Sequence, residues 1–168
     1  MLVYHPAFDL YHCVFRMLQI LEHMKRVDVE VDRLRIWDFY LTFPNEARKI
    51  SFPMDLKDLK KVFRSKDPNP YEDLIDAKRI LLRMKSYQVA ALKCLASYDL
   101  IDQDELSNGY VKRTDNAIPK EISEKINELT IEQENILKLV IGFTELPLFG
   151  KSGLKSRTGL LDFRYDAK

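Results

Sequence analysis

The stretch Gly150-Lys151-Ser152 matches the end of a phosphate-binding loop, so nucleotide binding is the first chemistry to test. A full loop reads G-x-x-x-x-G-K-[ST], because an early glycine lets backbone N–H groups curl around the phosphates. The position of that early glycine holds Glu145, whose carboxylate would repel the anion. We therefore expect no nucleotide-binding site in this segment.

The histidines do not have the spacing of a metal site. His12 and His23 share one helical face but lie three turns apart, which is roughly 16 Å at a rise of ~1.5 Å per residue. One ion cannot reach both, and the chain has no H-E-x-x-H motif and no Cys/His cluster. Asp9 can pair with His12 as an ordinary local contact. We expect no metal ion and no other cofactor.

A catalytic nucleophile is equally unsupported by the sequence. Cys13 adjoins His12, but neighbours on a helix point about 100° apart. No G-x-S-x-G motif is present. Cys13 and Cys94 also lack a C-x-x-C partner, which is typical of reduced thiols in a cytosolic protein. The sequence therefore indicates a protein that is not an enzyme.

Two groups of cations are candidates for binding chemistry. The first group could contact a DNA backbone and comprises Lys57, Lys60, Lys61 and Arg64, with Lys112 and Arg113 further along the chain. A solvent-exposed helix face without any partner would show the same pattern. The second lies in the loop 150–160, where cations alternate with apolar residues. Such a mixture suits a protein partner better than bare DNA. We assign partner binding there to Phe149, Lys151, Leu154, Lys155 and Arg157.

Helices must position these residues. Apolar periodicity predicts helices over 8–25, 30–42, 55–66, about 71–97 and after Thr130, where T-I-E-Q forms a capping box. The segment 71–97 could be two helices joined near Ser86-Tyr87. Asn108-Gly109 favours a type I′ turn before Tyr110-Val111, which predicts a small β-hairpin after a helix. The fold class expected is mainly α with a small β-hairpin, winged-helix-like.

Length and composition set the remaining limits. With 168 residues, 46% hydrophobic residues and a net charge of +1, the chain is expected to form one winged-helix-like domain over 1–168. The apolar content of 146–168 predicts a packed C-terminal extension. Neither a signal peptide nor a membrane-spanning apolar run is present, so we expect a soluble cytoplasmic protein without membrane contact.

Four segments together resemble one family. They are HPAFDLYHCVFRMLQIL (5–21), RLRIWDFYLTFP (33–44), LASYDLID (95–102) and LFGKSGLKSRTGLLDFRYD (148–166). They resemble the middle component of bacterial ABC-three-component conflict systems, a group similar to the small subunit of Lamassu antiphage defence. The resemblance runs across nearly the whole chain.

The resemblance implies a non-enzymatic adaptor with a winged-helix-like fold. It would sit between an ABC ATPase similar to structural-maintenance-of-chromosomes (SMC) proteins and an effector, often a nuclease, and would reach DNA through that complex. By pattern, Trp37, Phe39 and Tyr40 are assigned to a partner interface. The alternative is a DNA-binding winged-helix transcriptional regulator, although the helix before the predicted hairpin offers only Gln88 and Lys93 for base readout.

Overall fold

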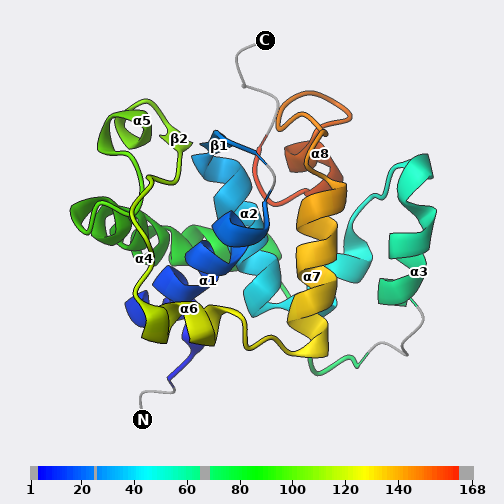
Figure 1. Cartoon of the computed structure of the whole chain (residues 1–168). Helices are drawn as coiled ribbons and strands as arrows, with labels where there is room; N and C mark the ends of the chain where they lie inside the picture. Colours follow the sequence, from blue (N-terminus) through cyan, green and yellow to red (C-terminus); the bar gives the residue numbers. More distant parts are fainter. Residues whose placement is uncertain (1–3, 25, 65–68, 163–168) are drawn as a thin grey trace.

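The computed structural model describes residues 4–24, 26–64 and 69–162. Three helices form its centre: α1 (Leu10–His23), α2 (Val31–Thr42) and α4 (Ala77–Ser97) pack on one another, and α4 crosses behind α1 (Figure 1). Capping fixes two of their starts, because Asp9 accepts the N–H of His12 at 2.9 Å and Asp76 accepts that of Arg79 at 3.1 Å. α4 is one helix with no break at Ser86-Tyr87.

A small antiparallel sheet closes one end of this helical core. β1 (Val29–Glu30) pairs with β2 (Tyr110–Val111), with Val29 opposite Val111, and Ile101 forms an isolated bridge with Arg113. The chain order is therefore helix, strand, two core helices and, after the bridging residue Ile101, a second strand; the segment between Ile101 and β2 takes the place of the wing. This order is winged-helix-like, and the expected fold class is confirmed.

The predicted turn at Asn108-Gly109 is wrong in detail. A type I′ turn needs positive φ at both central residues, but Asn108 has a φ of −88° and only Gly109 is positive, at 86°. The two residues instead end a short helix, α5 (Gln103–Ser107), that occupies the wing. β2 consequently pairs with the distant β1 and not with a strand across its own turn.

The remaining elements surround the core. Between α2 and α4 lie η2 (Pro44–Lys49), η3 (Met54–Leu56) and α3 (Lys57–Arg64); η1 (Pro6–Phe8) precedes α1, and α6 (Lys120–Ile126), α7 (Ile131–Gly142) and α8 (Leu154–Thr158) complete the described chain. The capping box predicted at Thr130 and Gln133 is present at the start of α7. Figure 1 shows α7 at the front, with α3 beside it at the right.

Side chains from the C-terminal segment complete the core. Leu148, Leu154 and Leu160 are at most 5% exposed and belong to the same apolar cluster as α1 and α2. The last part of the predicted extension, residues 163–168, lies outside the described residues. Within the described chain, no helix is long and apolar enough to cross a membrane.

Candidate functional site

The aromatic residues assigned to a partner interface lie in the core. Trp37 and Phe39 are fully buried and Tyr40 is 2% exposed, because the α2 segment that carries them is covered on several sides by packed elements. Phe143, which directly follows α7, packs edge-on against Trp37, with ring centroids 5.6 Å apart. Burial also raises the pKa of Tyr40 far above its usual range. The interface assignment of Trp37, Phe39 and Tyr40 is therefore wrong.

In the basic loop after α7, some of the assigned side chains are buried in the fold and others are exposed. Leu154 is fully buried and Lys155 is 5% exposed, so neither can contact a partner on the folded chain. Lys155 pairs with Asp32 of α2 at 3.1 Å and lies over the Phe149 ring. These burials correct the assignment of Leu154 and Lys155. Phe149 and Lys151 are exposed, and their partner role stays a prediction.

Arg157, the last member of that set, is half-buried and connects two loops. Its Nε donates to the carbonyl of Ser152 at 2.8 Å, and its Nη1 donates to the carbonyl of Ser51 at 3.0 Å. The N–H of Ser51 in turn donates to the carbonyl of Arg157 at 2.9 Å. The guanidinium therefore holds the loop in place, whatever else it binds.

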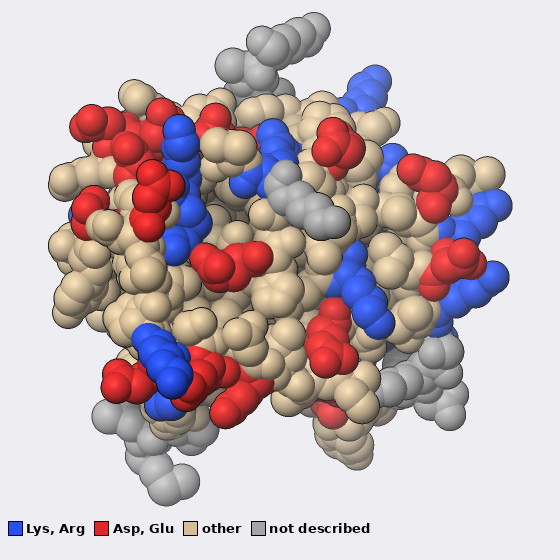
Figure 2. Space-filling view, in the orientation of Figure 1, with Lys and Arg blue, Asp and Glu red and all other residues tan. Residues whose placement is uncertain are grey.

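The cations predicted to contact DNA do not form one surface. Lys57, Lys61 and Arg64 are exposed on α3 and Lys60 is half-buried there. Lys112 and Arg113 follow β2, which Figure 1 shows on the other side of α7 from α3. Figure 2 shows Lys and Arg side chains interleaved with Asp and Glu over α3 at the right-hand edge.

The second pair of predicted DNA contacts sits next to β2. Arg113 is used internally, since it pairs with Glu22 at 2.9 Å and donates to the carbonyls of Leu100 and Asn116. Lys112, beside it, is half-buried. DNA contact by this pair, or by the α3 face, stays a prediction.

A chain of buried polar groups joins α1, α2, α4 and the C-terminal loop. Asp38 of α2 is fully buried and accepts hydrogen bonds from Arg16 Nε at 2.6 Å and Gln88 Nε2 at 2.8 Å. The Oε1 of Gln88 accepts from Arg35 at 2.9 Å, and Arg35 donates to Asp32 at 3.0 Å. Asp32 also holds Lys155, so the chain of contacts runs from the centre of the core to α8.

Cys13 belongs to this network and is not a nucleophile in this setting. Burial, then the charge of Asp38, raises the pKa of its thiol far above the usual range. The protonated Sγ lies 3.7 Å from Asp38 Oδ2, to which it can donate. A reactive cysteine needs the opposite environment, exposed and electropositive enough to stabilise the thiolate.

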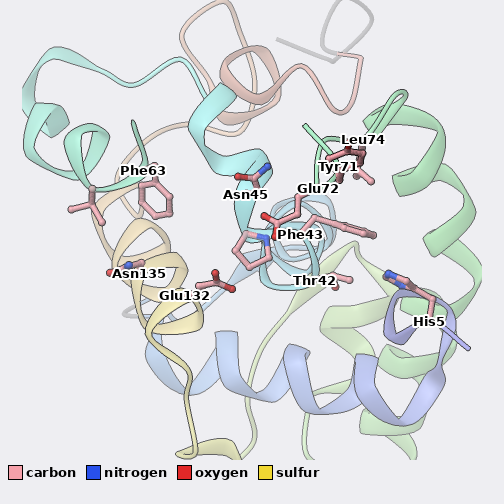
Figure 3. A pocket seen from close by; sticks show the side chains of 12 residues that line it. His5, Thr42, Phe43, Asn45, Phe63, Tyr71, Glu72, Leu74, Glu132 and Asn135 are labelled. Atoms are coloured by element: carbon pink, nitrogen blue, oxygen red, sulfur yellow. The ribbon is translucent and has the colours of Figure 1, made fainter. Parts of the chain in front are cut away.

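A groove of about 580 Å³ that the sequence analysis missed lies on the described part of the chain. Figure 3 shows its lining side chains converging from segments far apart in the sequence. The lining consists of His5, Thr42, Phe43, Pro44, Asn45, Val62, Phe63, Tyr71, Glu72, Leu74, Glu132 and Asn135. It combines aromatic faces with carboxylates and amides.

Two sets of contacts hold one wall of the groove in place. Asp73 pairs with Arg48 of η2 and accepts a hydrogen bond from Asn45 at 3.0 Å. One residue on, the N–H of Leu74 donates to Glu46 Oε1 at 2.9 Å. The segment that carries Tyr71 is thereby fixed against η2, although Tyr71 itself is 95% exposed.

His5 also lines the groove and stacks on Phe43, with ring centroids 5.4 Å apart. Its Nδ1 accepts the N–H of Ala7 at 3.1 Å. Burial, then the charge of Arg16, lowers the pKa of His5, which favours the neutral ring. Within the described residues, no group of three His, Cys, Asp or Glu side chains is arranged to hold a metal ion.

The Arg48–Asp73 pair predicts an acid-sensitive fold. The hydrogen bond from Arg48 lowers the pKa of Asp73. Partial desolvation of the carboxylate opposes this shift, and the charge of Lys49 adds to it. A carboxylate with a lowered folded-state pKa stabilises the fold above its unfolded pKa of about 3.9 and loses that contribution as pH falls through the folded value. The urea concentration at the midpoint of unfolding should therefore decrease as the pH is lowered below about 4. The midpoint of the Asp73→Asn variant should decrease less over the same pH range. Equal drops would contradict the prediction.

These observations define a mainly helical, winged-helix-like protein with a polar and aromatic groove. Over residues 2–166 the chain matches the family described as ABC-three component (ABC-3C) system Middle Component 5. The chain belongs to this family, and the resemblance to a middle component is confirmed. It is thus a component of an ABC-three-component system, whose other components are encoded in the same operon. No curated protein and no solved structure matches it.

Proposed function

We propose that this chain is a non-enzymatic cytoplasmic adaptor that bridges an SMC-like ABC ATPase and a nuclease-type effector, in a complex directed against phage or plasmid DNA and similar to Lamassu. Family membership over residues 2–166 carries the proposal. A middle component must contact two other proteins, and it reaches DNA through them. No cofactor is needed for this role.

The groove supports the proposal as a place where one of these partners docks. Tyr71 projects from a wall that Arg48 and Asp73 fix in place, so the aromatic side chain can be buried by a partner without ordering a loop first. Exposed aromatic side chains on rigid supports are frequent anchors of protein interfaces. Glu72 adds negative charge beside it, which favours a partner segment carrying Lys or Arg.

Co-purification of the operon proteins with variants of this chain tests the proposal. Tyr71→Asp should reduce recovery of the ATPase or the effector at least about tenfold, because it removes an anchor of the size that costs ~2 kcal/mol in an interface. The matched control is Tyr98→Asp, which changes an exposed tyrosine at the end of α4 that does not line the groove. Equal recovery with both variants would remove the groove from the proposal, and no recovery with wild type would remove the adaptor role.

The DNA-binding regulator is the alternative function. Base readout would use outward polar groups on the helix before the wing, which is α4. Gln88, one of the two polar side chains that the sequence offered for this purpose, is fully buried and bonded to Asp38 and Arg35. Lys93 is exposed and can contact a phosphate, but a lysine alone reads little sequence.

A further inference from the structure

The outward face of α4 carries positive charge with no negative charge among it. Five cations lie on the helix, and its sequence from Ala77 to Ser97 contains no Asp or Glu; the five, all exposed, are Lys78, Arg79, Arg83, Lys85 and Lys93. No ion pair within the described residues involves any of them. This separates α4 from α3, where Lys61 pairs with Asp58.

Apolar side chains lie between these cations. Leu82 is 67% exposed, and Val89, two turns further along the same face, is only half-buried and does not belong to the apolar cluster of the core. Residues seven apart fall nearly above one another on a helix. Lys78 and Lys85 repeat at the same spacing along one edge. The face is therefore a narrow apolar stripe with basic flanks, about 22 Å long between residues 78 and 93 at ~1.5 Å per residue.

We propose that this face of α4 binds an acidic amphipathic helix of a partner protein in the complex. The partner would place apolar side chains on Leu82 and Val89, and its Glu or Asp side chains would meet the flanking cations. Such a helix carries an apolar stripe that can cover Leu82 and Val89, and carboxylates on either side of it that can meet the flanking cations. The inference rests on the proposed adaptor function and names a second surface, distinct in its residues from the groove.

DNA fits the same face less well. A duplex offers phosphates to the five cations but leaves Leu82 and Val89 against a charged backbone. The chain's net charge of +1 gives little long-range attraction to a polyanion.

Three variants of the tagged chain, co-expressed with the other two proteins of its operon and purified with and without nuclease treatment, test the proposal. Lys85→Glu/Lys93→Glu reverses two cations of the face, and Leu82→Ser removes the centre of its stripe. The control, Lys120→Glu/Lys125→Glu, makes the same charge change on two exposed lysines of α6. All five positions are exposed, so thermal unfolding should be unchanged.

Each result decides between the possibilities. We expect both α4 variants to lower recovery of one operon protein at least about tenfold, with the α6 control unchanged. If the charge reversal weakens recovery only before nuclease treatment and Leu82→Ser has no effect, DNA occupies the face and the proposal is wrong. Recovery unaffected by either α4 variant overturns the α4 proposal but leaves the adaptor function intact. Failure of wild type to recover either protein overturns both.

Discussion

Replacing Asp38 with alanine is expected to lower the free energy of unfolding by about 3–5 kcal/mol, the range for breaking a buried ion pair from one side. Asp38 is fully buried and binds Arg16 at 2.6 Å, so the substitution leaves a guanidinium in the core without its counter-charge. It also removes the acceptor for Gln88 of α4. Chemical unfolding followed by circular dichroism measures the effect.

The control for this prediction is Asp58→Ala on α3. Asp58 also pairs with a cation, Lys61 at 3.4 Å, but both side chains are exposed, and such surface pairs contribute roughly 0–1 kcal/mol. A second variant, Asp38→Asn, keeps the side-chain volume and one acceptor oxygen and should lie between the two. If Asp38→Ala unfolds at the same denaturant concentration as the α3 control, the buried network does not support the fold.

The second large effect is expected for Lys155→Glu, at about 2–4 kcal/mol of lost stability. Lys155 is 5% exposed and its Nζ lies 3.1 Å from Asp32, so the change places two carboxylates together beside the core. The cost is smaller than at Asp38 because Asp32 is partly exposed. Lys151→Glu, in the same loop but exposed, should leave stability unchanged.

Hydrogen exchange shows where the Lys155 variant loosens. The N–H of Ser51 donates to the carbonyl of Arg157, so its protection reports on the docking of α8. We expect faster exchange at Ser51 in Lys155→Glu and wild-type exchange in Lys151→Glu. Equal protection in both variants would contradict the role given to Lys155. Loss of complex assembly in a Lys155 variant thus reports on folding and does not identify an interface.

The sequence predicted the helices because their signals are local. Thr130 with Gln133 and Asp9 with His12 are caps within one turn, and apolar periodicity placed α1, α2 and α7 closely. The turn prediction at Asn108-Gly109 was wrong because the same two residues are common both in a hairpin turn and at the end of a helix. The partner of β2, residues 29–30, lies too far along the chain for a local pattern to reveal it.

Surface assignments failed for a related reason. Trp37, Phe39 and Tyr40 point in different directions around α2, and in a surface helix some of them would be exposed. Other elements cover α2 on several sides, and even its charged residues Arg33 and Asp38 are buried. Burial of these two charged residues depends on hydrogen bonds to residues outside α2. Arg33 donates to the carbonyls of Phe143 and Leu146. Asp38 accepts from Arg16 and Gln88.

The groove and the α4 face differ in how far sequence could reveal them. The groove gathers residues from five stretches between His5 and Asn135, so no single stretch carries its signal. The α4 face was visible in part, because the helix contains five cations and no carboxylate. The sequence left open whether the segment 71–97 is one helix or two joined near Ser86-Tyr87, and two helices would divide that pattern.

The most direct test of the adaptor role is to assemble the complex with and without this chain. The ATPase and effector of the operon are co-expressed, treated with nuclease and sized by chromatography with light scattering, in the presence and absence of the chain. We predict one complex of all three proteins, and separate ATPase and effector when this chain is omitted. An ATPase–effector complex that forms equally well without it would contradict the bridging role.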